Sequence, residues 1–214
     1  IPLQQLTGVQ EFMGLEFYVN EHVLIPRQDT ETLVELVLSE HKEKNISLLD
    51  VCTGSGCIAI SLAKLGGYTD VTALDLSEEA LKVARSNGEK LLDQPVKFIK
   101  SDMFSALNPE KQYNVIVSNP PYIPSQVIEG LEPEVKDHEP RMALDGEPDG
   151  LKFYRILAEE GKKYLKNGGS IYMEIGWDQA KDVTEIFEAM GFSGRRTVRD
   201  MAGNDRVVCA RKEK

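Results

Sequence analysis

Apolar residues in the middle of the chain fall in short continuous runs that are separated by longer amphipathic stretches. The runs predict buried strands at 46–52, 71–76, 96–102, 114–119 and 170–176. The amphipathic stretches predict helices at 57–65, 78–92, 151–165 and 181–190, with Ser77 as the N-cap of the second. An earlier helix follows Asp29 or Thr30, either of which can cap it. Strands that alternate with helices predict an α/β fold with a parallel sheet and right-handed crossovers.

The two ends of the chain and one internal segment depart from this alternation. Residues 11–25 contain two β-prone runs that flank Asn20-Glu21, which predicts an N-terminal β-hairpin. Strands near 196–198 and 206–210, joined by a turn at 202–205, predict a closing hairpin that is antiparallel to the rest. Residues 125–150 form a long proline-containing segment, which is typical of a lid or a binding loop.

Composition narrows the class of protein. The 214 residues suit one large domain, and 25 basic against 35 acidic residues give a net charge of −10. This balance argues against stable binding of long nucleic acid. No run approaches the ~18 apolar residues of a membrane span. Three cysteines in no zinc-binding spacing predict no metal site and favour a reducing compartment, so we expect a cytoplasmic location.

A glycine-containing loop follows the first predicted parallel strand. The sequence Asp50–Gly56 reads DVCTGSG, and glycines there let the backbone approach a ligand at a helix N-terminus. Asp75, at the end of the next strand, can accept the hydroxyls of a ribose. Together they predict a site for an adenosine-containing ligand. Residues 54–59 also fit the dinucleotide fingerprint, so the loop alone leaves an oxidoreductase open.

The sequence Asn119-Pro120-Pro121-Tyr122, after the fourth predicted strand, decides between these readings. The Asn119 side chain and the carbonyl of Pro120, which stands in a rigid turn, offer two hydrogen-bond acceptors for one planar –NH2 group. Tyr122 supplies a flat face for that group. Two acceptors can orient a weakly nucleophilic amide or base amine and stabilise it as its bonding changes. A dehydrogenase has no need of such an arrangement.

These motifs resemble those of S-adenosylmethionine-dependent methyltransferases of the seven-strand class. More narrowly, the chain is similar to the bacterial glutamine methyltransferases of class I peptide release factors. The similarity runs from about residue 3 to residue 212. Its motifs, in family order, are PRQDTE (26–31), DVCTGSG (50–56), NPPYIP (119–124), HEPRMALDGEPDGL (138–151) and MEIGWDQ (173–179).

The resemblance implies a fold and a set of site residues. It implies a seven-stranded Rossmann-like sheet, mostly parallel with an antiparallel last strand, preceded by the hairpin. S-adenosyl-L-methionine would be the cofactor and S-adenosyl-L-homocysteine the product. The substrate would be the glutamine of the release factor's Gly-Gly-Gln motif, held by Asn119, Pro120, Pro121 and Tyr122; Asn119, Pro120 and Tyr122 would be catalytic. The cofactor would contact Cys52, Thr53, Gly54, Ser55, Gly56, Asp75, Asp102, Met103 and Asn119.

The resemblance also implies a domain organisation. Residues 1–28 would be a linker with the hairpin, and residues 29–214 the methyltransferase domain. The helical N-terminal domain usual in the family is absent from this sequence. Cys52 stands where a glycine is usual, and we expect a negative φ there, because a positive φ strains a residue with a side chain. Arg27 and Glu31 either shape the site or pair with each other, and Glu174 and Asp178 either line the site or are solvated charges at a strand end.

Three alternatives stay open beside methylation of release factors. The chain could methylate a nucleobase amine in DNA or RNA, because the same turn serves that chemistry. It could methylate a glutamine of a ribosomal protein. It could also be an inactive cofactor-binding module, although the intact turn at 119–122 argues against that. We expect a monomer that acts on class I peptide release factors and does not bind a membrane.

Overall fold

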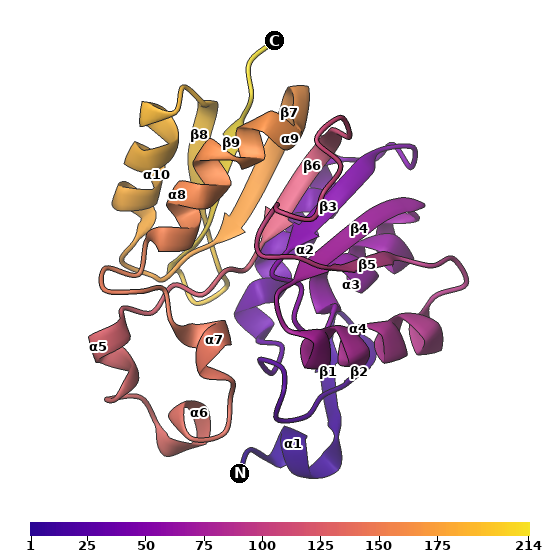
Figure 1. Cartoon of the computed structure of the whole chain (residues 1–214), viewed down its shortest axis with the longest axis vertical. Helices are drawn as coiled ribbons and strands as arrows, with labels where there is room; N and C mark the ends of the chain where they lie inside the picture. The colour runs from indigo at the N-terminus through magenta and orange to yellow at the C-terminus, as the bar shows by residue number, and fades with distance from the viewer.

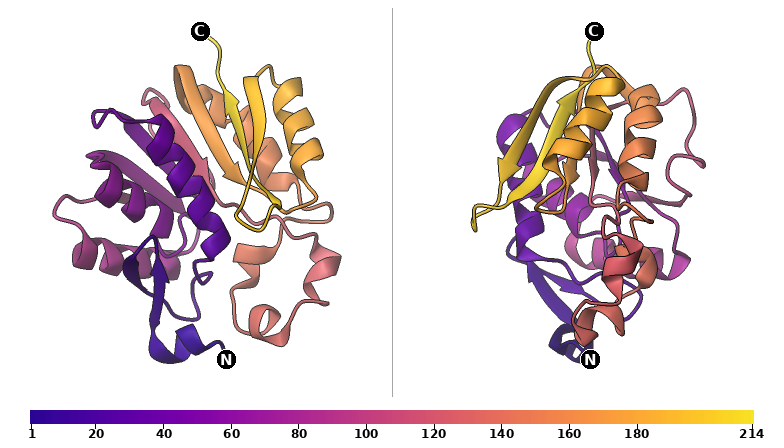
Figure 2. Two further views of the ribbon diagram at one scale, coloured as in Figure 1. Left: turned by 180° about the vertical axis from the view of Figure 1, so that it is seen from behind. Right: turned by 90° about the vertical axis from the view of Figure 1, so that its left-hand side faces the viewer.

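A computed structural model describes residues 1–214 and contains a seven-stranded sheet with helices on both faces (Figures 1 and 2). The strand order is β5-β4-β3-β6-β7-β9-β8. The strands are β3 (Ser47–Val51), β4 (Asp70–Asp75), β5 (Lys97–Lys100), β6 (Tyr113–Ser118), β7 (Leu165–Glu174), β8 (Ser193–Arg199) and β9 (Asp205–Arg211). β3 to β7 pair in parallel, and β9 is antiparallel to β7. The predicted sheet class is thus confirmed.

Only one strand of the closing hairpin opposes the rest of the sheet. β8 pairs with β9 in antiparallel fashion, so it runs in the same direction as β7. The prediction that both final strands are antiparallel to the others is therefore wrong for β8. A chain that crosses over through α10 (Ala180–Ala189) returns to the sheet in the original direction, and the tight turn before β9 then reverses it.

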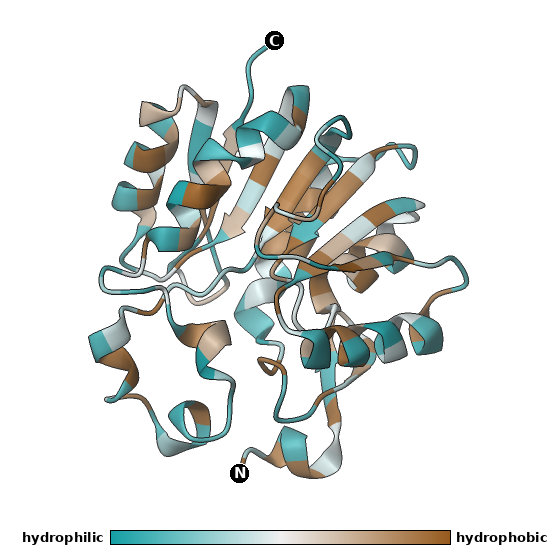
Figure 3. Ribbon diagram, viewed as in Figure 1, coloured by the Kyte–Doolittle hydropathy of each residue, from teal (hydrophilic) through white to brown (hydrophobic).

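Alternate residues of the strands divide the apolar core into two layers. Leu48, Val115 and Tyr172 face α2 (Glu31–Glu40) and α3 (Cys57–Gly66), whereas Leu49 and Ile116 belong to the layer under α8 (Lys152–Glu159) and α10. Because both faces of the sheet are covered, its central strands are buried and mostly apolar (Figure 3). Polar side chains that serve a ligand are thereby confined to the strand ends and the loops after them.

The predicted N-cap residue is observed at one helix and not at another. At α4 (Glu78–Leu91) the Ser77 hydroxyl accepts a hydrogen bond from the Ala80 amide at 3.1 Å, which confirms the predicted cap. α2 begins after a 3-10 turn, η1 (Gln28–Thr30), and neither Asp29 nor Thr30 caps it with its side chain. The predicted cap there is wrong, because the 3-10 turn supplies backbone acceptors in its place.

The N-terminal hairpin exists, but its turn lies earlier than predicted. It consists of β1 (Val9–Phe12) and β2 (Leu15–Tyr18), preceded by α1 (Leu3–Thr7). The chain reverses at Met13-Gly14, whose φ values of 52° and 72° suit a type I′ turn. The Met13 amide donates to the Glu31 carboxylate at 2.8 Å, which ties this turn to α2. Asn20, the predicted turn residue, instead accepts from the His22 amide in a local turn beyond β2.

The segment at 125–150 is built from three single-turn helices. They are α5 (Ser125–Ile128), α6 (Pro133–Lys136) and α7 (Arg141–Leu144), and α9 (Gly161–Tyr164) follows α8 beyond them. In Figure 1 this segment lies beside α1 and the hairpin, on the side of the sheet to which the parallel strands point. No helix of the protein is long and apolar enough to cross a bilayer.

Asn87 of α4 joins three parts of the fold through one buried side chain. Its Nδ2 donates to the carbonyls of Tyr18 at 3.0 Å and Ser55 at 2.9 Å, and its Oδ1 accepts from the Tyr18 amide at 2.7 Å. The side chain is completely buried. A buried amide with all of these bonds made fixes the hairpin and the glycine loop against α4.

We predict that Asn87→Ala lowers the free energy of unfolding by about 2–4 kcal/mol, because three backbone groups lose the partner that a buried side chain gives them. Urea denaturation followed by circular dichroism measures the change. Ser86→Ala, an exposed position of the same helix, is the control and should have little effect. Equal stability of the two variants would show that Asn87 does not hold these parts together.

Candidate functional site

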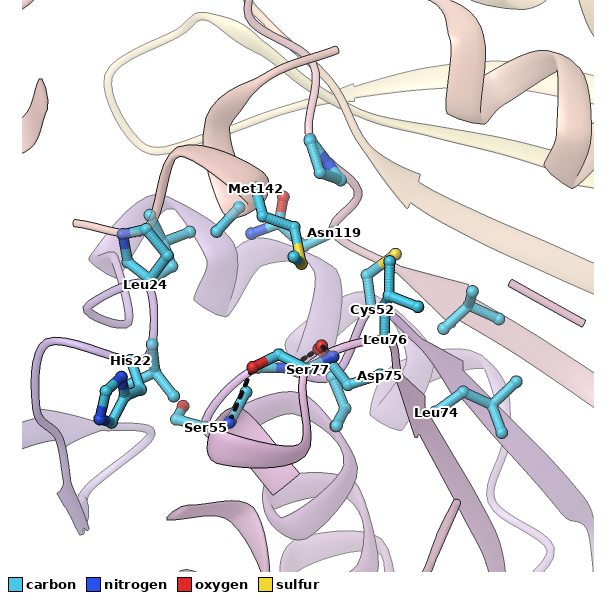
Figure 4. A pocket seen from close by; sticks show the side chains of 18 of the residues that line it. His22, Leu24, Cys52, Ser55, Leu74, Asp75, Leu76, Ser77, Asn119 and Met142 are labelled. Atoms are coloured by element: carbon cyan, nitrogen blue, oxygen red, sulfur yellow. Dashed lines mark hydrogen bonds between the residues drawn. The ribbon is translucent and has the colours of Figure 1, made fainter. Parts of the chain in front are cut away.

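A cavity of about 240 Å³ opens at the carboxyl ends of β3, β4, β5 and β6. Its floor is the glycine loop after β3 and the chain after β4. Its other walls come from four separate segments: residues 101–103, the start of the turn after β6, part of 21–30, and part of 140–143. Figure 4 shows Asn119 and Met142 on one side of the cavity and Asp75 and Ser77 on another. Parallel strands bring these distant residues to one edge of the sheet.

The glycine loop turns through a residue that the sequence analysis expected to be unstrained. Cys52 has a φ of 64°, so the expected negative φ is wrong. The loop's own hydrogen bonds require this conformation: the Thr53 amide donates to the Leu74 carbonyl at 2.8 Å, and the Thr53 hydroxyl donates to Asp50 at 2.7 Å. These bonds outweigh the cost of a left-handed cysteine. The loop is intact, as expected.

The two predicted glycines of the loop have different structural roles. Gly54 has a φ of 56°, and a Cβ at this position would meet no protein atom within 4 Å. It lines the cavity and leaves space for a ligand. Gly56 does not line the cavity; a Cβ there would lie 2.9 Å from Ile60 Cδ1 and 3.2 Å from Ala84 Cβ. Gly56 therefore permits the close packing of α3 against α4.

Asp75 connects the ends of β3 and β4. One carboxylate oxygen accepts from the Gly54 amide at 2.8 Å, and the other accepts from the Ser77 amide at 2.9 Å. Burial raises the pKa of this carboxyl, while the two amides oppose that rise. Each oxygen keeps a lone pair beyond these bonds, and the residue lines the cavity. The geometry suits acceptance of two neighbouring hydroxyls of a sugar.

Sulfur atoms and exposed apolar side chains complete this part of the cavity. Cys52 Sγ lies 3.8 Å from Met103 Sδ, and both residues line the cavity with Asp102. Burial raises the pKa of the Cys52 thiol far above its ordinary value, so it is protonated at neutral pH. Leu76 lines the same space although 46% of its surface is exposed, as does Met142 with 55%. Exposed apolar side chains around a cavity are typical of a site for a flat apolar group.

The turn after β6 meets the cavity with only half of its residues. Asn119 and Pro121 line it, whereas Pro120 and Tyr122 do not. The Tyr122 hydroxyl donates to Glu174 Oε1 at 3.2 Å, on the side away from the cavity. Asn119 is half-buried, which leaves its amide accessible from the cavity. Tyr122 is thus held at the edge of the candidate site, where a substrate group would have to reach it.

Arg27 forms part of the cavity wall and pairs with a residue that the sequence analysis did not name. Its guanidinium pairs with Glu139 of the 125–150 segment, which is buried and also accepts from the Ile25 amide at 3.0 Å. Arg27 does not pair with Glu31, whose carboxylate binds the Met13 amide. Neither Glu174 nor Asp178 lines the cavity.

Several residues that line the cavity were not predicted from the sequence. They include residues 21–24, Leu76, Met142 and Phe153. Leu76 carried one detectable signal, an apolar residue directly after a strand-terminal carboxylate. The others come from a loop and from the helices α7 and α8, and the position of these segments depends on tertiary contacts such as the pairing of Arg27 with Glu139.

Comparison with known proteins gives a consistent picture. The family model of the methyltransferase small domain matches residues 28–130. The release factor glutamine methyltransferases of Geobacter sulfurreducens and Clostridium acetobutylicum are 42% and 44% identical to this chain. Each match covers 98% of this chain, which spans 73% and 75% of the lengths of the two relatives. The enzyme of that name from Fusobacterium nucleatum is 44% identical over 99% of the chain, which spans 60% of its length.

Solved structures agree with the sequence relatives. A release factor-specific protein-(glutamine-N5) methyltransferase from Alicyclobacillus acidocaldarius is 32% identical, with a TM-score of 0.54 over 92% of this chain and 100% of that one. A methyltransferase from Pyrococcus furiosus has a TM-score of 0.70 at 20% identity and covers 94% of this chain and 91% of its own. At that identity, the second likeness concerns the fold alone.

The buried Glu174 predicts a pH dependence of stability. Burial raises its pKa from 4.5 to about 7, against the opposing effects of Arg206 and Tyr122, and its Oε2 has no hydrogen-bond partner. The folded protein therefore binds this proton more tightly than the unfolded chain. Stability from this group is fully present below pH ~4.5 and is lost as the pH rises towards about 7.

We predict that Glu174→Gln, which cannot ionise, gains stability relative to the original chain by about 1–3 kcal/mol between pH 5 and pH 8. Urea denaturation across this range measures the difference. Asp50, whose pKa burial also raises to about 7, contributes the same dependence to both proteins and cancels. Glu159→Gln, at an exposed position, is the control. Stability curves that stay parallel for Glu174→Gln would contradict the assigned shift.

Proposed function

The chain belongs to the family of release factor glutamine methyltransferases, and we propose that it methylates the side-chain amide nitrogen of the glutamine in the Gly-Gly-Gln motif of class I peptide chain release factors. The observation that carries this proposal is the single cavity in which a nucleotide-type loop and the Asn119–Tyr122 turn meet. The donor and the acceptor of a transferred group can then lie in line within one enclosed space.

S-adenosyl-L-methionine, the methyl donor of this family, supplies an electrophilic methyl group on a sulfonium. The cavity fits such a molecule, because Gly54 leaves open space at the loop and Asp75 presents two free lone pairs. We propose that Asp75 binds the ribose. We also propose that Cys52, Thr53, Gly54 and Ser55 surround the methionine end, and that Asp102 and Met103 border the adenine beside Leu76. Gly56 supports the loop from outside the cavity.

The Asn119–Tyr122 turn would act on the substrate amide. Asn119 Oδ1 and the Pro120 carbonyl would accept the two hydrogens of the –NH2 group and direct its nitrogen towards the cavity. Two acceptors favour the pyramidal nitrogen that forms as the bond from nitrogen to the methyl group is made and the methyl–sulfur bond breaks, with S-adenosyl-L-homocysteine as the leaving group, so they bind the transition state more tightly than the planar amide. The methylated nitrogen then loses a proton to water. This path needs no thiolate, in agreement with the raised pKa of Cys52.

Methylation of a nucleobase amine is the second candidate. An rRNA N2 G1207 methyltransferase from Thermus thermophilus, solved with AdoMet and guanosine, is 16% identical with a TM-score of 0.68 and covers 96% of this chain and 50% of its own. That likeness concerns the fold alone. Relatives at 42–44% identity and the net charge of −10 favour the protein substrate. We infer that the enzyme acts in the cytoplasm, where release factors function, and we predict a monomer.

We predict that the chain transfers label from tritiated S-adenosylmethionine to a class I release factor. The same factor with its Gly-Gly-Gln glutamine changed to alanine should remain unlabelled, because the accepting nitrogen is missing. Unmethylated DNA and RNA at equal concentration test the second candidate. Label on nucleic acid alone would replace the proposed function by base methylation, and label on the alanine factor would exclude the proposed glutamine as the only acceptor.

We predict that Asn119→Ala lowers turnover on the order of 100-fold or more, while the affinity for S-adenosylhomocysteine changes by no more than a few-fold. The reason is that the lost acceptor acts on the amide mainly in the transition state. Single-turnover labelling and isothermal titration calorimetry measure the two quantities. Asn108→Ala, at an exposed site outside the cavity, is the matched control. Near-normal turnover of Asn119→Ala would remove Asn119 from the reaction.

A further inference from the structure

The two prolines of the Asn119–Tyr122 turn fix their own φ angles, but they provide no hydrogen bonds that anchor the turn to the rest of the fold. Pro120 and Pro121 have no N–H groups, so neither residue can donate a backbone hydrogen bond. The nearest backbone support comes one residue later, where the Ile123 amide donates to the Leu144 carbonyl at 3.0 Å. Two acceptors that must bind one amide need a fixed separation, so the turn has to be held from outside.

Gln179, at the start of α10, provides one such support. Its Nε2 donates to the Tyr122 carbonyl at 2.9 Å and to the Gly150 carbonyl at 3.3 Å, and its Oε1 accepts from the Gly176 amide at 2.9 Å. Only 7% of its surface is exposed, and it does not line the cavity. This one buried side chain thus uses both of its N–H donors and its acceptor oxygen to bind backbone groups of three segments.

Glu174, at the end of β7, holds the same turn through the side chain of Tyr122. Its Oε1 accepts from the Tyr122 hydroxyl at 3.2 Å, while its backbone carbonyl accepts from the buried Tyr154 hydroxyl at 2.7 Å. β7 lies inside the sheet between β6 and β9 and is therefore a rigid base. Tyr122 is consequently bound at both its carbonyl and its hydroxyl by residues that follow or end one central strand.

Two glycines of the 138–151 motif bring a third segment against the turn. A Cβ on Gly146 would lie 2.8 Å from Tyr122 Cα, and a Cβ on Gly150 would lie 2.5 Å from the Tyr122 carbonyl oxygen and 2.9 Å from Gln179 Nε2. Only glycine permits this approach at either position. The Gly146 amide also donates to the Ile123 carbonyl at 2.8 Å. The segment that ends the 125–150 loop is therefore packed directly against the turn.

We propose that Gln179 and Glu174 are positioning residues, which clamp the Asn119–Tyr122 turn between β7 and residues 146–150 and so fix the two acceptors of the substrate amide. The effect on catalysis rests on the proposed function, whereas the clamp itself is a property of the fold. A turn released by about 1 Å would lose on the order of 100-fold in rate while keeping most of the cofactor site, which lies at the ends of β3, β4 and β5. The clamp explains the structural role of residues 146–150 and 173–179, which belong to two of the sequence motifs.

The test uses Gln179→Met, which keeps the length of the side chain and removes its hydrogen bonds, and Gln179→Glu, which keeps the acceptor for Gly176 and places a carboxylate against two carbonyls. We expect kcat on the release factor to fall about 10- to 100-fold, with the Kd for S-adenosylhomocysteine within threefold of the original. Asp178→Asn, an exposed neighbour outside the cavity, is the control and should change neither. Folded fractions are matched by circular dichroism at the assay temperature.

Hydrogen–deuterium exchange of the same proteins provides a readout that needs no activity. The amides of Ile123 and Gly146, which bond across the turn, should exchange faster in both Gln179 variants, and those of residues 53–56 should not change. Unchanged kcat, or unchanged exchange at these two amides, would overturn the clamp. A parallel loss of kcat and cofactor affinity would do so as well. If the original chain fails to label any release factor, the proposed function fails. The exchange rates alone then decide whether Gln179 holds the turn.

Discussion

The carboxylate of Asp75 fixes the geometry on which the rest of the site depends. By accepting from the Gly54 and Ser77 amides, it joins the loop after β3 to the end of β4 and sets the floor of the cavity. The loop can meet it only because Cys52, Gly54 and Gly56 all adopt positive φ values. The strain at Cys52 is therefore a cost of the loop conformation that presents Gly54 to a ligand. Without this joint, only the Thr53–Leu74 backbone bond would tie the loop to the end of β4.

The walls of the cavity depend on contacts between segments far apart in sequence. Glu139 holds Arg27 and the Ile25 amide, which joins the 125–150 segment to the chain between the hairpin and α2. Asn87 ties the hairpin and the glycine loop to α4. Asn87 is satisfied by backbone groups alone, and Glu139 by one backbone amide and the Arg27 guanidinium. These contacts anchor the irregular segments that form the cavity walls.

The sequence predicted the features that arise from local patterns. Apolar runs identified the parallel strands, Ser77 identified a helix start, and the spacing from Gly54 to Asp75 identified the floor of the site. It failed where a distant contact decides the local conformation. Met13 turns the hairpin because the Glu31 carboxylate binds its amide, and Cys52 adopts a positive φ because Thr53 bonds to Leu74 and Asp50. The position of Tyr122 likewise depends on Glu174 and Gln179, whose distance in sequence conceals the contact.

The fold thus divides the requirements of group transfer between two halves of the sheet. β3 and β4 provide a loop with open backbone and a carboxylate, which suits the binding of a nucleoside. β6 and β7 provide a proline turn with free acceptors and its buried supports, which suits the orientation of an amide. A weakly nucleophilic amide gains little from a base before transfer but much from exact alignment. Rigidity of the turn is therefore the property that this chemistry demands most, and the buried hydrogen bonds of Tyr122 are the means by which the chain achieves it.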